Sequence, residues 1–153
     1  MKRFMYFTMC LCAMFAVLSS CSSGGNGLIG KWEQTISEAG ANAVATYDFK
    51  DNGKMTQTMV MKSETPSINI EGEGTCDYTY SEADKTITFK FSASDFNFKT
   101  FEIEGIDEAS MEMAMDQMKS QMVNMAQKFT DVNIDGDKLT ANFNGQEVEM
   151  KRM

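Results

Sequence analysis

The sequence predicts a mainly β fold, in which an antiparallel meander of about eight strands closes into a barrel and one amphipathic helix is inserted between strands six and seven. Three observations predict it. Apolar and polar residues alternate over most of the chain from Leu28 onward, and turn-forming residues separate the alternating runs. Residues 108–129 depart from this pattern, because they contain neither Gly nor Pro and their apolar residues recur at helical spacing.

The alternating runs predict half-buried strands that each have one apolar face. Tyr47 and Phe49 share one parity against polar neighbours, and Phe89 and Phe91 do the same in a later run. We expect strands near residues 28–38, 43–50, 54–63, 67–80, 85–92, 95–105, 137–144 and 147–152.

Short turn signals lie between these runs. Asn144-Gly145 is the dipeptide most typical of a tight hairpin, and Asp51-Asn52-Gly53, Ser81–Asp84 and Asp135-Gly136 are also turn-forming. Successive hairpins place strands that are neighbours in sequence side by side in the sheet. About eight such strands suffice to close a small barrel and remove its exposed edges.

Residues 108–129 predict a helix about 33 Å long. Asp107 is suited to cap its N-terminus, and acidic residues in the first turns agree with the helix dipole. Its apolar residues form one stripe: Met111, Met115, Met118, Met122, Met125 and Phe129. A helix of this length could cross one end of the barrel or lie along its side.

The N-terminus resembles the signal peptide of bacterial lipoproteins. Lys2 and Arg3 precede an apolar run that ends at Leu18, and Leu18-Ser19-Ser20-Cys21 resembles the lipobox cut by signal peptidase II. The resemblance implies that residues 1–20 are removed, that Cys21 carries palmitate-type acyl chains, and that these chains attach the protein to a membrane. Residues 21–27 would then form a flexible tether, and residues 28–153 the barrel domain.

This resemblance also implies a location. Ser22 after the modified cysteine is similar to lipoproteins sent to the outer membrane of Gram-negative cells, and the absence of an acidic tag in residues 22–26 favours the periplasmic face over the cell surface. Cys10 and Cys12 would leave with the leader, so Cys76 would be the remaining thiol.

Composition excludes several function classes. Removal of the leader takes Lys2 and Arg3 with it and changes the net charge from −8 to −10, which disfavours binding to nucleic acid. Histidine is absent, which excludes imidazole catalysis and zinc sites that need histidine.

The start of the first strand resembles the Gly-x-Trp opening of lipocalins and of lipocalin-like domains in bacterial lipoproteins. Gly30-Lys31-Trp32 carries this motif, and Gly74 opens a strand that is similar to a later one of the family. The resemblance implies that Arg152, near the end of the last strand, packs over Trp32 and closes the barrel. The helix departs from the family pattern, because it precedes the last two strands instead of following the barrel.

The resemblance implies a non-catalytic module that binds a small apolar ligand without a cofactor. The candidate ligand contacts are Met111, Met115, Met118, Met122, Met125, Tyr47, Phe49 and Phe89. The alternative is an envelope lipoprotein that contacts another protein and whose barrel is filled by its own side chains. Methionine suits both, since its unbranched thioether adapts to varied apolar shapes and also fills gaps.

Two patterns allow a metal site but have simpler explanations, and we expect none. The methionines of the helix and Met59-Val60-Met61 could bind copper(I), but a helical stripe is typical of packing. Residues 131–136 begin like a calcium loop, but its twelfth position is Asn142 instead of glutamate, and an Asp-Gly hairpin turn explains the same residues.

Two further patterns allow catalysis, but we expect no enzyme. Glu71 and Glu73, like Glu147 and Glu149, share one face of a strand, which is compatible with paired-carboxylate hydrolysis but more typical of a solvated face. Cys76 has no histidine to activate it, so we expect a buried apolar residue.

Overall fold

The computed structural model describes residues 27–38, 41–124, 127–143 and 145–153. The predicted leader, Cys21 and the tether up to residue 26, together with Met125 and Asn144, lie outside the described residues. The elements are strands β1 (Gly30–Glu38), β2 (Ala41–Phe49), β3 (Lys54–Glu64), β4 (Ser67–Ser81), β5 (Thr86–Phe89) and β6 (Phe96–Ile103), helix α2 (Glu108–Asn124), and strands β7 (Gln127–Asp135), β8 (Lys138–Phe143) and β9 (Gln146–Arg152).

Eight of these strands form a closed antiparallel barrel. The order around the ring is β1-β2-β3-β4-β5-β7-β8-β9, and β9 pairs back with β1. Strand β6 pairs with β4 and stands outside this ring, and α2 follows β6 and precedes β7. The predicted fold, a mainly β barrel of about eight antiparallel strands with one inserted helix, is confirmed.

The predicted C-terminal boundary of the helix is wrong. Helix α2 ends at Asn124, and Phe129 lies in strand β7, which the alternating pattern did not predict. Phe129 continues the four-residue spacing of the methionine stripe, so periodicity alone favoured helix. Pairing of β7 with β5 and β8 overrides that preference, because these hydrogen bonds complete the ring.

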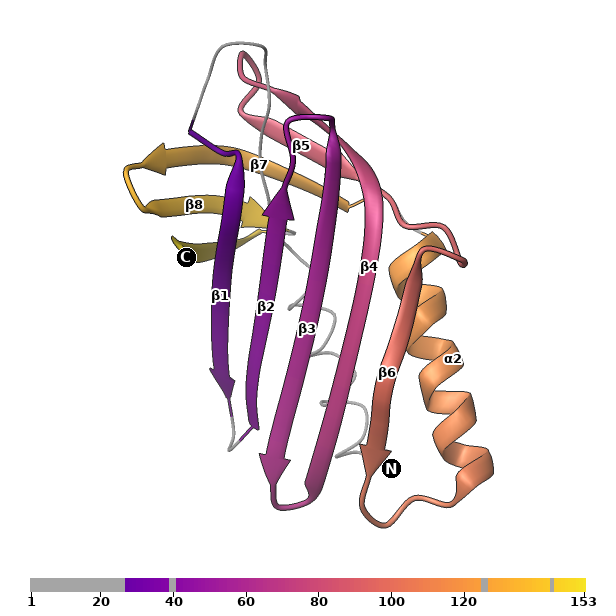
Figure 1. Ribbon diagram of the computed structural model, residues 1–153. Helices are drawn as coiled ribbons and strands as arrows, with labels where there is room; N and C mark the ends of the chain where they lie inside the picture. The colour runs from indigo at the N-terminus through magenta and orange to yellow at the C-terminus, as the bar shows by residue number, and fades with distance from the viewer. Residues whose placement is uncertain (1–26, 39–40, 125–126, 144) are drawn as a thin grey trace.

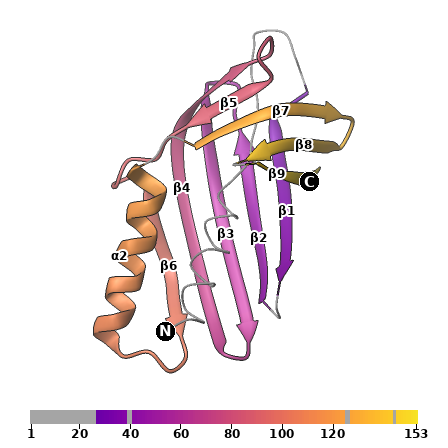
Figure 2. The same cartoon turned by 180° about the vertical axis from the view of Figure 1, so that it is seen from behind.

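Strand β4 divides the barrel into two parts. One edge pairs with β3, whereas the other edge pairs with β6 from Ile68 to Gly74 and with β5 from Tyr78 to Ser81. At what we call the closed end, β5, β7, β8 and β9 complete the ring. In what we call the extended half, β1 to β4 run on beyond these four strands and β6 lies beside β4 (Figures 1 and 2).

Strand β1 shows the same division. It pairs with β2 along its whole length but with β9 only at Trp32 and Glu33. Beyond Glu33, therefore, β1 belongs to the extended half, where its second neighbour is absent among the described strands.

The turns confirm their sequence signals. In the turn between β2 and β3, Gly53 has φ 77°, and the backbone N–H of Lys54 donates to Asn52 Oδ1 at 3.1 Å. Gly136 has φ 59° in the two-residue turn between β7 and β8. Glycine reaches such angles without steric cost.

Helix α2 lies beside β6 on the outer flank of the extended half (Figure 1). Asp107 caps it as predicted: the Ser110 backbone N–H donates to Oδ1 at 2.9 Å and the Ser110 hydroxyl to Oδ2 at 2.8 Å, and these bonds lower the pKa of Asp107. Met118 and Met122 of the predicted stripe are buried, whereas Met113 on another face is 71% exposed.

Candidate ligand-binding site

The closed end is fastened by Trp32 and Arg152. The Trp32 ring is fully buried and its Nε1–H donates to the Leu28 carbonyl at 2.8 Å. The Arg152 guanidinium lies over this ring, with Cζ 4.2 Å from the ring centroid, as the Gly-x-Trp resemblance implies. Gly30 (φ 125°) leaves space for it, because a Cβ there would lie 3.3 Å from Arg152 Nη1.

The same guanidinium ties the beginning of the described chain to its end. Arg152 Nη1 donates to the Ile29 carbonyl at 3.0 Å, Nη2 donates to the Gly27 carbonyl, and Nε lies 3.6 Å from Asp137 Oδ1. Every side-chain nitrogen of Arg152 therefore has a partner at the closed end, and this cation stabilises the closed end.

Aromatic rings fill the closed end and its border with β6. Neighbouring ring centroids lie 5.0 to 5.8 Å apart, a typical contact distance for aromatic pairs. The series is Phe143, Phe129, Phe89, Phe91, Phe96, Phe98 and Phe101. Two predicted ligand contacts lie in this filled region: Phe89 stacks on Phe129, and Phe49 packs edge-on against Tyr78 at 5.1 Å. Both rings therefore pack against other aromatic side chains of the protein.

Phe96 covers the two glycines of β4. A Cβ on Gly72 would lie 2.8 Å from Phe96 Cζ, and a Cβ on Gly74 would lie 2.5 Å from Phe96 Cδ2 and 2.8 Å from the Asp95 carbonyl oxygen. The absence of side chains here admits the Phe96 ring and leaves no room for a ligand.

The inner face of the extended half has a different composition. The described apolar residues that β1 to β4 place there are small or flexible, whereas β6 adds aromatic rings. On β1 to β4 the strand register places there Ile36, Ala43, Ala45, Met59, Met61, Ile68 and Ile70. Phe98, Phe101 and Ile103 of β6 share this face. Met59 and Met61 were noticed in the sequence only as copper ligands, although their parity with buried Met55 indicates an inward position.

Two buried glutamines interrupt this apolar face. Gln34 is 4% exposed and Gln57 is fully buried, and the Oε1 atoms of both have no hydrogen-bond partner. Gln57 Nε2 donates to Tyr47 Oη at 3.5 Å. A buried carbonyl without a donor costs roughly 1–3 kcal/mol, so such groups need an explanation. The sequence contains a signal that predicts both buried positions. Each glutamine is a polar residue whose neighbours of the same strand parity are apolar.

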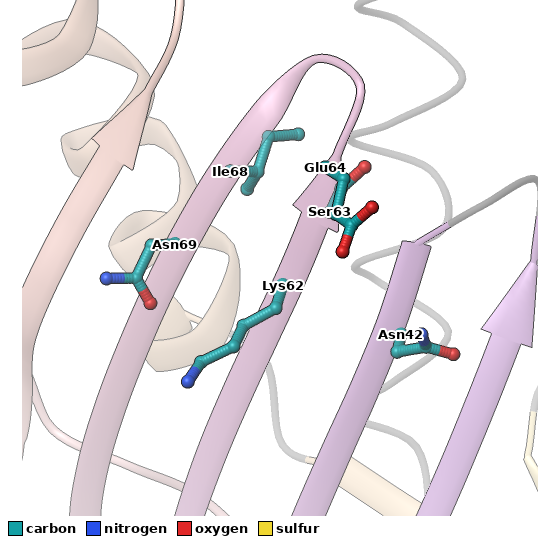
Figure 3. A pocket seen from close by; sticks show the side chains of 6 residues that line it. All are labelled: Asn42, Lys62, Ser63, Glu64, Ile68 and Asn69. Carbon is teal, nitrogen blue, oxygen red and sulfur yellow. The ribbon is translucent and has the colours of Figure 1, made fainter.

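A pocket of about 620 Å³ lies at the tip of the extended half, around the turn from β3 to β4 (Figure 3). It is lined by Asn42, Lys62, Ser63, Glu64, Ile68 and Asn69. Asn42, Lys62 and Asn69 are in register on the outer face, whereas Ile68 belongs to the inner face. The pocket thus spans the rim, and its lining is polar apart from Ile68, in contrast to the apolar cavity expected within the barrel.

The predicted methionine contacts fall into three groups. Met118 and Met122 are buried in the hydrophobic core, Met111 and Met115 are half-buried on α2, and Met125 lies outside the described residues. Tyr47 is fully buried between Trp32 on β1 and Gln57 on β3. The structure brings Tyr47 together with the two glutamines and keeps Phe49 and Phe89 at the closed end.

The buried ionisable groups are neutral at pH 7. Burial raises the pKa of Cys76 to about 12 and also raises the pKa of Tyr47. In the described part of the chain, no three His, Cys, Asp or Glu side chains are grouped so that they could hold a metal ion.

The paired carboxylates lie on the outer face. Lys99 Nζ lies 3.8 Å from Glu71 Oε1 and also contacts Glu73, and Lys138 Nζ lies 2.8 Å from Glu149. These are exposed ion pairs of the kind that contribute little to stability. No described helix combines the length and the apolar character needed to cross a membrane.

No protein-family model matches the chain, and no curated protein matches it.

Proposed function

We propose that this protein is a non-catalytic lipoprotein of the lipocalin-like type, anchored to the outer membrane, that binds a small apolar ligand against the inner face of the extended half. One observation carries the proposal. The closed end is filled by large rings, whereas the apolar residues that β2 and β3 place on the inner face of the extended half, Ala43, Ala45, Met59 and Met61, are small or flexible.

The geometry of the extended half supports this use. The four strands that complete the ring lie at the closed end, and none of the described strands crosses the inner face of β1 to β3 in the extended half (Figures 1 and 2). The side chains of this face are buried, with Met59 0% and Met61 1% exposed, so an apolar ligand seated there would gain about 25 cal/mol for each Å² of its own apolar surface that leaves water. Methionines at positions 59 and 61 would adapt to its shape.

Dye binding tests the ligand site. The Cys21→Ser protein, which lacks acyl chains, is titrated with the neutral dye N-phenyl-1-naphthylamine, and its fluorescence is expected to rise saturably to one dye per chain. Ala45→Phe fills the inner face and should weaken binding about tenfold or more, because overlap with a bulky ring removes the ligand's contacts. Val44→Phe adds the same ring on the outer face of the same strand and should leave binding unchanged.

Two results would refute this site: no saturable binding by the parent protein, or equal losses in Ala45→Phe and Val44→Phe. Far-ultraviolet circular dichroism of each variant establishes that the barrel is folded.

Membrane attachment through Cys21 supplies the second part of the proposal. Two or three acyl chains bury enough methylene groups, at about 0.8 kcal/mol each, for lasting attachment, whereas one chain is marginal. Fractionation of a Gram-negative host should find the acylated wild type in the outer membrane. The Cys21→Ser variant should carry no acyl chains and should be missing from that fraction. Unacylated wild type in the soluble periplasm would refute the anchor.

The second candidate function is contact with another envelope protein through α2. It is favoured by Met113, a large apolar side chain that is 71% exposed on this helix. This function predicts two results. The parent protein should not bind the dye, and Met113→Glu should abolish capture of the partner protein. Saturable dye binding that Ala45→Phe abolishes favours the ligand-binding function.

A further inference from the structure

The two orphaned glutamine carbonyls belong to the inner face on β1 and β3, the two strands that flank β2. Trp32, Tyr47 and Gln57 are in register across β1, β2 and β3, and Gln34 lies one inward position further along β1 from Trp32. Tyr47 therefore stands between the filled closed end and the ligand face, and the two amides flank it. Gln34 also lies where β1 has just separated from β9, since these strands pair only at Trp32 and Glu33.

Their burial gives these amides a chemical preference. Among the side chains that the structure describes, Gln34 Oε1 and Gln57 Oε1 are the buried oxygens or nitrogens without a hydrogen-bond partner. A carbonyl oxygen in an apolar interior has lost its water hydrogen bonds and regains stability only from a donor. The group that completes these hydrogen bonds must therefore be an O–H or an N–H.

The surroundings also select against charge. Arg152 is the cation that shares this inner face, and its nitrogens are engaged by Gly27, Ile29 and Asp137. Tyr47 keeps its proton, because burial raises its pKa. A carboxylate placed against the two carbonyls would meet like partial charges and no free cation on the described inner face.

We propose that Gln34 and Gln57 form the polar recognition end of the ligand site and select an uncharged amphiphile, a molecule with an apolar body and one hydroxyl or amide N–H donor. This proposal rests on the proposed function and names the class of its ligand. From Gln57 to Ser63, β3 extends roughly 20 Å, which accommodates a ten-carbon chain laid along the apolar face.

Matched probes test the proposal on the Cys21→Ser full chain. 1-Decanol, its methyl ether and decanoate each displace N-phenyl-1-naphthylamine, and their affinities are compared. The alcohol should bind about tenfold more tightly than the ether, since the ether has the same chain but no donor to give the carbonyls. Decanoate should bind more weakly than the alcohol.

Variants assign this preference to the amides. Gln34→Leu and Gln57→Leu keep similar volume and remove the carbonyl, so each should reduce the alcohol-to-ether preference to within about twofold while leaving the ether's affinity unchanged. Gln146→Leu, at an exposed glutamine of β9, should retain the full preference. Gln34→Leu should not lower the thermal midpoint, because it removes an unsatisfied buried carbonyl, whereas Gln57→Leu also removes the hydrogen bond from Gln57 Nε2 to Tyr47 Oη.

The outcomes separate the two proposals. Dye binding with no preference between alcohol and ether, or a preference that survives both inward substitutions, overturns the role of the amides and leaves the ligand site standing. Tighter binding of decanoate than of decanol overturns the choice of an uncharged head. No dye binding at all overturns both proposals.

Discussion

The closed end and the extended half are built from the same long strands but use their inner faces differently. At the closed end the inner face carries Trp32, Phe49 and Met55, which are fully buried in the hydrophobic core. In the extended half the same strands carry Ala43, Ala45 and Ile70. Closure therefore depends on large rings at one end, and the proposed binding function depends on their replacement by small side chains at the other.

The largest expected effect lies at the closed end. Trp32→Ala removes a fully buried ring and should lower the free energy of unfolding by about 3–5 kcal/mol, enough to unfold a marginal domain. Urea unfolding followed by circular dichroism measures it, with Val44→Ala on the outer face of β2 as the control. An equal loss in Val44→Ala would contradict the special role of the buried ring.

Arg152 tests how the closed end is fastened. Arg152→Leu keeps apolar bulk over Trp32 but loses the cation–π contact and strands the carbonyls of Gly27 and Ile29. The expected loss is about 2–4 kcal/mol in the same urea experiment. Lys151→Leu, at the exposed neighbouring position, is the control and should change stability by less than about 0.5 kcal/mol.

The border between the two parts depends on a glycine. Gly74→Ala places a Cβ against Phe96 and the Asp95 carbonyl, and should cost about 1–3 kcal/mol through overpacking. Adding Phe96→Leu should recover part of this loss, since the smaller side chain relieves one of three close approaches; the others are to the Asp95 carbonyl oxygen and to Phe91 Cε1 at 2.9 Å. Thr58→Ala on the outer face of β3 should be nearly neutral, and an equal loss there would refute the packing explanation.

Cys76 gives the smallest effect near neutral pH. Because burial holds its pKa near 12 in the folded protein, above the value of 9.0 in the unfolded chain, its contribution to stability is complete below pH 9 and falls as the pH rises toward 12. The native thiol should resist iodoacetamide at pH 8 and react after unfolding in urea. Rapid alkylation of the native protein would show that Cys76 is accessible.

Much of the fold could be predicted because local patterns determine it. Alternation assigned Tyr47 and Phe49 to the inner face, and Asp107 correctly marked the start of the helix. The end of the helix could not be predicted, since Phe129 satisfies both a helical stripe and a strand parity, and only its pairing with Ile87 decides between them. Whether β4 pairs with β5 or with β6 at a given residue is likewise a tertiary choice.

The candidate site was less predictable than the fold. Phe49 and Phe89 were chosen as ligand contacts for their apolar character, but register places them among other rings at the closed end. Gln34 and Gln57 carried a usable signal, a polar residue at an inward parity. That signal gains meaning only when the structure shows that their carbonyl oxygens have no partner.

The methyl groups of methionine test the central claim most directly, because the chain carries 15 methionines and they occur in both parts of the barrel. We would record the carbon-13 methyl spectrum of the labelled Cys21→Ser protein, assign it by substitution, and titrate with 1-decanol. All four methionines are buried, so the contrast depends on place alone: we expect saturable shifts at Met59 and Met61 of the extended half and none at Met55 and Met150 of the closed end. Shifts confined to Met55 and Met150, or no shifts at all, would contradict the claim.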